Sequence, residues 1–388
     1  MLVDDRGRHT RRPRAPGPTP AHEQVRTRPV ALPHPGPSDT ISAVRLGRTF
    51  IGPTFDVLLI GGVLSLPVAL VAYLVGFRFD CVSMWQVLLL TTYAHVAASL
   101  VRLYSVPGAI RSRPFLTLGF PVVTAVVTGA VVISSSRVFS HVQGLYLSWS
   151  AYHYAAQTYG IALLYIYRSG GTLSQQEKTF LRAACLATFF YALLKTNSGV
   201  AMIIPASVYT TWPALETLRT GVRALALVAL VAAPVALAVH RWRRGQALPG
   251  MSLVLLFTNA VWWVVFPSED AFAWAAISHG VQYMAIATLL HVKEATVPVK
   301  EGGSQRAPAY RAAAFYAGCV ALAYALYYGA PPIYGALGTH FTHSAAFARI
   351  ALMLNFHHVI LDGFIWKRRQ SAPAPVREVG APLGVPAT

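Results

Sequence analysis

The stretch LNFHHVILDGFIWKRR, residues 354–369, combines the features that decide how this chain folds. It is apolar over most of its length and ends in three consecutive cations, as a transmembrane helix does where it meets lipid headgroups. Two adjacent histidines and an aspartate nevertheless lie at its centre. Ionisable side chains inside a membrane are costly and are kept there for a function. The stretch therefore predicts a membrane helix that carries part of a functional site.

The composition of the whole chain favours the same setting. Of the 388 residues, 55% are hydrophobic and 12% are charged, and the mean hydropathy is +0.48. Soluble globular domains carry about 25% charged residues, so we expect an all-α, polytopic membrane protein with about ten transmembrane helices. The apolar runs long enough to cross a bilayer are residues 52–76, 84–106, 114–136, 139–167, 177–195, 217–239, 249–267, 271–292, 310–336 and 346–366.

The distribution of positive charge indicates how these helices are oriented. Lys and Arg collect in short cytoplasmic loops, and every dense cluster falls on one face if both termini are cytoplasmic. Anionic membrane lipids on that face explain the net charge of +18, and we expect no nucleic-acid partner. The clusters are Arg45 and Arg48; Arg102, Arg111 and Arg113; Arg168, Lys178 and Arg182; Arg241, Arg243 and Arg244; Lys293, Lys300, Arg306 and Arg311; and Lys367, Arg368 and Arg369.

The two ends of the chain differ from its apolar centre. Residues 1–42 are rich in Arg, Pro and His without hydrophobic periodicity, which predicts a disordered basic cytoplasmic tail. Residues 43–369 form the predicted transmembrane helical domain, and residues 370–388 a short Pro-rich cytoplasmic tail. We expect the protein to be integral to a bacterial cytoplasmic membrane.

Histidines inside the predicted helices share one level of the membrane. His95, His153, His279 and His357 lie on four helices of the same direction, about 9 to 14 residues before the inner ends. At about 1.5 Å per residue, their depths differ by no more than about 8 Å. This layer predicts a metal site between the midplane and the cytoplasmic side. The candidate ligands are His95, His153, His279, His357 and His358.

Polar residues accompany these histidines at helical spacing. Gln157 follows His153 by four positions, while Gln282 and Tyr283 follow His279 by three and four. Such neighbours share a helix face and often hold an imidazole in place. Gln157 and Gln282 are therefore candidate catalytic residues, either making supporting hydrogen bonds or binding a polar group.

The opening stretch repeats this pattern. Asn355 precedes His358 by three positions and Asp362 follows it by four, so all three share one helix face. Asp362 is predicted either to bind the metal or to orient the imidazole of His358. His357 projects about 100° away from His358, so the pair could serve two metals or link one site to a neighbouring helix.

The residue types indicate which metal such a site would hold. Neutral imidazoles with few carboxylates favour iron, copper or zinc over magnesium or calcium. The His357–His358 pair in NFHHVILD and the multispan character resemble the histidine-motif oxygenases that act on lipids, namely membrane desaturases, fatty-acid hydroxylases and alkane hydroxylases. The resemblance implies one or two non-haem irons that activate dioxygen and oxidise an apolar substrate. It also implies a cytoplasmic electron donor, while copper, zinc and haem stay open as cofactors.

Three alternatives to this oxidoreductase stay open. A membrane cytochrome would use two of the imidazoles as axial haem ligands. A proton-coupled transporter would use the histidines and Asp362 as a titrating relay. The histidines could also serve only as hydrogen-bonding groups between helices.

Overall fold

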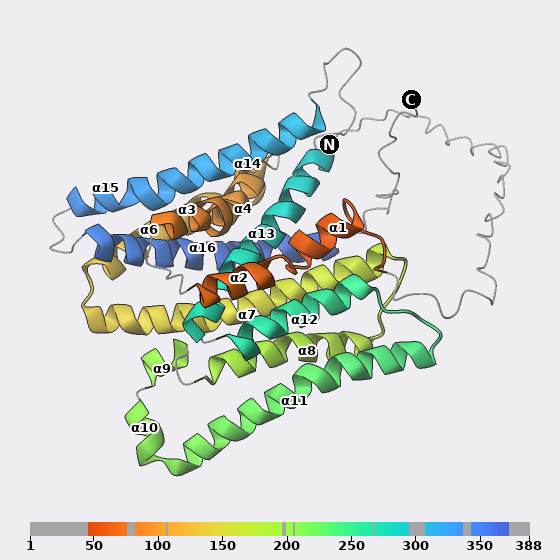
Figure 1. The fold of residues 1–388 in the computed structure, drawn as a ribbon. Coiled ribbons are helices and arrows are strands. Elements are labelled where there is room, and N and C mark those ends of the chain that lie inside the picture. Colours follow the sequence, from red (N-terminus) through yellow and green to blue (C-terminus); the bar gives the residue numbers. More distant parts are fainter. Residues whose placement is uncertain are drawn as a thin grey trace, which may run out of the picture. The chain divides into compact units, whose positions relative to one another are not determined.

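The computed structural model describes most of the chain between residues 46 and 371, and every regular element among the described residues is a helix (Figure 1). The predicted all-α class is therefore confirmed. Residues 1–42 and nearly all of residues 370–388, predicted to be cytoplasmic tails, lie outside the described part. The described ranges are 46–75, 82–105, 108–195, 199–204, 206–266, 268–294, 307–336 and 343–371.

The helices follow one another with short connections, and four of the described segments, labelled η, have the wider turns of a π-helix. The first half contains α1 Pro53–Phe55, η2 Asp56–Ile60, α2 Ser65–Leu74, α3 Val82–Leu88, η3 Leu89–Tyr93, α4 Ala94–Tyr104, α5 Ala109–Ser112, η4 Phe115–Gly119, α6 Phe120–Ile133, α7 Ser136–Arg168 and α8 Gln175–Leu193. The second half contains α9 Gly199–Ile203, α10 Ala206–Thr211, α11 Pro213–Arg243, α12 Gly250–Val265, α13 Ser268–Glu294, α14 Pro308–Tyr324, η5 Ala325–Gly329, α15 Ala330–Ala336 and α16 His343–Ser371.

Each of the ten predicted apolar segments coincides with a helix or with a run of adjoining helices. By length and apolarity, four helices in the described part could cross a membrane, or five if one pair bent by 47° counts as a single span. The helices α7 and α13 are long, with 33 and 27 residues, but neither is among these candidate spans. The candidate spans are Trp85–Tyr104, Phe115–Ile133, Pro213–Arg243 and Pro308–Tyr334, with the bent pair Pro53–Ile60 and Ser65–Leu74. That the chain crosses the membrane ten times, with both termini cytoplasmic, stays a prediction.

Four helices form a closed ring of contacts that positions the candidate site. Helix α4 packs against α13 and α16, and α7 packs against the same two helices. In Figure 1, α7 and α16 are long rods and α13 runs steeply across them. Helix α11 lies outside this ring, where it packs along α8, while α8 and α12 both contact α7. The ring therefore brings together four segments that are far apart in sequence.

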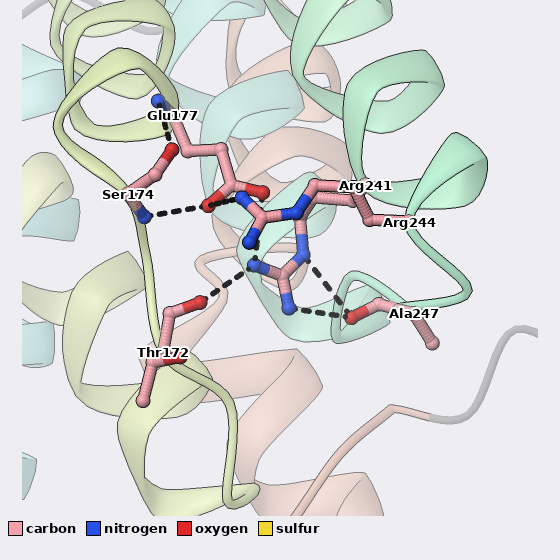
Figure 2. A network of polar contacts seen from close by, with 6 residues as sticks. All are labelled: Thr172, Ser174, Glu177, Arg241, Arg244 and Ala247. Atoms are coloured by element: carbon pink, nitrogen blue, oxygen red, sulfur yellow. Dashed lines mark hydrogen bonds and ion pairs between the residues drawn. The ribbon is translucent and has the colours of Figure 1, made fainter.

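The connections at one end of α8 and α11 are held by buried charges (Figure 2). Ser174 and Glu177 form a capping box at the start of α8, in which each side chain accepts a hydrogen bond from the other residue's backbone N–H. The carboxylate of Glu177 is fully buried and lies 3.5 Å from the guanidinium of Arg241. Arg241 also donates hydrogen bonds to the carbonyls of Thr172 and Ala247, so this end of the two helices is fixed by one guanidinium.

A second buried acid fixes the segment that precedes α1. Asp56 is fully buried and accepts hydrogen bonds from the backbone N–H groups of Phe50, Ile51 and Gly52. The hydroxyl of Tyr165 on α7 donates a fourth hydrogen bond to the same carboxylate, at 2.6 Å. Asp56, one of the few acidic residues in the predicted spans, thus has a structural role in joining this segment to α7.

Candidate metal centre

Four histidines meet inside the ring of helices, one from each helix. His95 comes from α4, His153 from α7, His279 from α13 and His358 from α16. One ring nitrogen of each lies within 4.8 Å of a ring nitrogen of every other. His95, His279 and His358 are buried and His153 is partly buried. We call these four residues the histidine cluster.

The imidazole rings follow the order of the helices around the ring. The centroid of His95 lies 4.4 Å from that of His358 and 4.8 Å from that of His279. The centroid of His153 lies 4.8 Å from that of His279 and 5.3 Å from that of His358. Neighbouring rings meet at steep interplanar angles of 67° to 89°. The Nε2 atoms of His95 and His358 approach to 2.9 Å, so both nitrogens face the centre of the cluster.

The histidine cluster could hold a single metal ion if its four nitrogens moved closer together. Two nitrogens bound to one ion at about 2.1 Å can be at most about 4.2 Å apart, so the widest separation of 4.8 Å would have to close by about 0.6 Å. The Nε2 atoms of His153 and His279 are buried and have no hydrogen-bond partner within the described part of the chain. Each such buried nitrogen costs about 1–3 kcal/mol, and a metal ion would satisfy both.

A glycine allows two helices of the ring to approach closely. A Cβ added to Gly280 on α13 would lie 2.9 Å from the carbonyl carbon and oxygen of Thr91, and 3.1 Å from the Cα of Thr92. Both threonines belong to η3, the π-helical segment that leads directly into α4. Single π-helical turns often occur at functional sites. The close approach beside Gly280 brings the ring of His279 to that of His95.

The imidazole of His358 has a polar neighbour at each ring nitrogen. Its Nδ1 lies 3.1 Å from Oγ of Ser99, a buried residue of α4. Its Nε2 lies 3.6 Å from Oδ2 of Asp362, whose other oxygen accepts a hydrogen bond of 3.0 Å from the hydroxyl of Tyr283. Asp362 therefore lies on the side of the nitrogen that faces the cluster, and Ser99 lies at the rear of the ring.

The predicted polar neighbours are placed around the cluster in different ways. The amide of Gln157 donates to the carbonyl of His279 at 3.2 Å and to Oε1 of Gln282 at 3.3 Å. Gln157 thus joins α7 to the backbone of α13 beside a cluster histidine, and Gln282 accepts a second hydrogen bond from the same amide. Asn355 instead donates to the carbonyl of Ala351, one turn earlier on its own helix.

The structure does not bring His357 together with the other predicted ligands. Its Nδ1 lies 2.8 Å from Oγ1 of Thr124 on α6, and its ring stacks on Phe120 at 4.4 Å. Adjacent residues of an α-helix project about 100° apart, so His357 faces α6 while His358 faces the cluster. The histidine cluster therefore includes only one member of the predicted His-His pair.

Two residues that support the cluster, Ser99 and Gly280, are absent from the predicted site. Ser99 follows His95 by four positions and so shares its helix face, a spacing that could have indicated it. Tyr283, the polar neighbour that the sequence places four positions after His279, donates its hydroxyl hydrogen to Asp362. Gly280 carried no comparable signal, because its role depends on which helix faces it.

Comparisons with protein-family models, with curated proteins and with solved structures give no match for this chain. The resemblance of the His357–His358 pair to histidine-motif oxygenases thus stays a prediction. The function has to be argued from the chemistry of the histidine cluster.

Proposed function

We propose that this protein is a membrane-embedded metalloenzyme whose histidine cluster binds one redox-active metal ion and oxidises an apolar substrate. The observation that carries this proposal is the convergence of four imidazoles from four distant helices, with ring nitrogens within 4.8 Å of one another. Hydrogen bonding between helices would need each imidazole to find a partner. The buried Nε2 atoms of His153 and His279 find none within the described residues, which favours a bound ion.

The ligand set favours iron or copper as the redox-active ion. Four neutral imidazoles suit iron, copper or zinc, whereas magnesium and calcium prefer oxygen ligands. Of these, iron and copper change oxidation state readily and zinc does not. Two ions about 3.5–4 Å apart would need more ligands than the cluster supplies. We therefore propose one ion, with the carboxylate of Asp362 near enough to act as a further oxygen ligand.

The spacing of the rings disfavours the two other functional interpretations. A haem group needs room for a porphyrin between its axial imidazoles, whereas neighbouring ring centroids here are 4.4–5.3 Å apart. A proton-coupled transporter needs titrating groups distributed along a path across the membrane. The four imidazoles are instead gathered around one point.

The setting of the cluster suggests the class of substrate. Helices that carry the cluster pack against candidate membrane spans, so an apolar or lipid substrate could enter from the bilayer. The bound ion would supply the chemistry of dioxygen activation, for which a cytoplasmic donor would provide electrons. The protein would enclose the ion, because His95, His279 and His358 are each less than 5% exposed. We place this activity in a bacterial cytoplasmic membrane.

The adjacent histidines provide a matched test of this proposal. The full chain is purified in mild detergent, and bound iron, copper and zinc are measured by mass spectrometry in the wild type, in His358→Ala and in His357→Ala. Both changes remove a buried imidazole from α16. We expect stoichiometric metal in the wild type and in His357→Ala, and loss of metal in His358→Ala. Metal-free wild-type protein, or equal metal in both variants, would contradict the proposal.

A further inference from the structure

Ser99 occupies a buried position that connects two helices of the histidine cluster. It is fully buried on α4, one turn after His95 and on the same helix face. Its hydroxyl lies 2.7 Å from the carbonyl oxygen of Val96 and 3.1 Å from Nδ1 of His358. One helix thus supplies both a cluster histidine and a polar partner for a second one.

The hydrogen bonds of this hydroxyl determine where His358 carries its proton. A serine hydroxyl has one hydrogen to donate, and a carbonyl oxygen can only accept. The hydrogen of Ser99 is therefore used by Val96, and the serine oxygen must accept from Nδ1–H of His358. A neutral imidazole carries a single N–H. Its Nε2, which faces His95, consequently has a free lone pair.

On this basis, and resting on the metal centre proposed above, we propose that Ser99 is a positioning residue that fixes the tautomer of His358 and so presents Nε2 to the metal ion. Metal-bound histidines usually donate their second ring N–H to a carboxylate, a carbonyl or water, which fixes the orientation of the ring. Ser99 supplies that acceptor here. Asp362, the partner expected from helical spacing, lies at the opposite nitrogen, 3.6 Å from Nε2.

Removal of the Ser99 hydroxyl should weaken metal binding, although all four histidines of the cluster remain. In Ser99→Ala, Nδ1 of His358 loses its acceptor, so the tautomer with the proton on Nε2 becomes populated and cannot bind metal. The probe is Co²⁺, titrated into chelator-treated full-length protein in mild detergent and followed by its visible absorption. We expect Ser99→Ala to bind Co²⁺ about 10-fold to 100-fold more weakly than wild type. Ser99→Thr, which keeps a hydroxyl, should restore binding.

Ser252→Ala is the matched control, because Ser252 is also fully buried and its hydroxyl donates to a helix carbonyl, that of Ala162 on α7. It should bind Co²⁺ as the wild type does. If Ser99→Ala matches this control in Co²⁺ affinity, the inference is wrong.

A second measurement needs no metal and separates this inference from the proposed function. In ¹⁵N-histidine-labelled protein, the signals of His358 are identified by their loss in His358→Gln. We expect Nδ1 to be protonated and Nε2 unprotonated in the wild type, and a shift toward the other tautomer in Ser99→Ala. An unprotonated Nδ1 in the wild type would overturn the inference. Wild-type protein that shows the expected tautomer but binds no Co²⁺ would contradict only the metal centre.

Discussion

Gly280→Ala should destabilise the protein and deplete its metal, because the helices around the cluster cannot make room for a methyl group. The added Cβ would lie 2.9 Å from two atoms of the Thr91 peptide group, which is closer than ordinary van der Waals contact. Both atoms are backbone, so no side chain can rotate away. Helix α13 or η3 must move by about 0.5 Å, and overpacking of this kind costs about 1–3 kcal/mol.

The same movement affects the histidine cluster, because His279 is the residue next to Gly280 on α13. The four nitrogens must already move closer together by up to about 0.6 Å to share one ion. A methyl group that forces α13 and η3 apart by about 0.5 Å opposes this closure, so we expect lower metal occupancy as well as lower stability. The assay combines thermal unfolding in mild detergent with bound metal per chain, measured on the same preparations.

Gly160→Ala on α7 is the control, since a Cβ at this position meets nothing within 4 Å. Alanine is favoured over glycine in helices by up to about 1 kcal/mol, so this change should be neutral or stabilising. The reasoning about close helix approach is refuted if Gly280→Ala unfolds at the same temperature and holds as much metal as Gly160→Ala.

Three further changes test other parts of the structure. Glu177→Ala should lower the free energy of unfolding by about 3 kcal/mol, because it leaves the buried guanidinium of Arg241 without its carboxylate. Thermal or denaturant unfolding measures this, and an unchanged midpoint would contradict it. Tyr165→Phe should cost about 0.5–1.5 kcal/mol in the same assay, because the carboxyl group of Asp56 loses one of its four hydrogen bonds. An unchanged midpoint would contradict this. Chelation of the bound metal should lower the unfolding temperature of the wild type but not that of His95→Ala. A free metal concentration of about 100 times the Kd stabilises the folded state by about 2.7 kcal/mol, and chelation removes this contribution. Equal shifts in both proteins would point to a different metal site.

The helices and the meeting of histidines from distant helices could be predicted from the sequence for simple physical reasons. Apolar runs of about 20 residues form helices in a membrane because the backbone must satisfy its own hydrogen bonds. Helices of the same direction also allow depth to be counted along the chain. That count placed His95, His153 and His279 at one level, and the structure brings these three together with His358.

The lateral arrangement of the helices could not be predicted in the same way. Helix periodicity shows which residues share a face, but it does not show which neighbouring helix that face meets. His357 is adjacent to His358 in sequence but faces Thr124 on α6. We propose Ser99 for the orienting role that was also considered for Asp362, because the partner of Nδ1 comes from α4 and not from the helix of His358 itself. The number of membrane spans and their orientation depend on the bilayer, so both stay predictions.

X-ray absorption at the edge of the bound metal tests the central claim most directly. The full chain is purified in mild detergent without added metal, and the spectrum reports the type, number and distance of the ligands. The histidine cluster predicts one ion per chain with four imidazole nitrogens at about 2.0–2.2 Å. A spectrum with sulfur ligands, a spectrum with only one or two imidazoles, or a chain that retains no metal would contradict the claim.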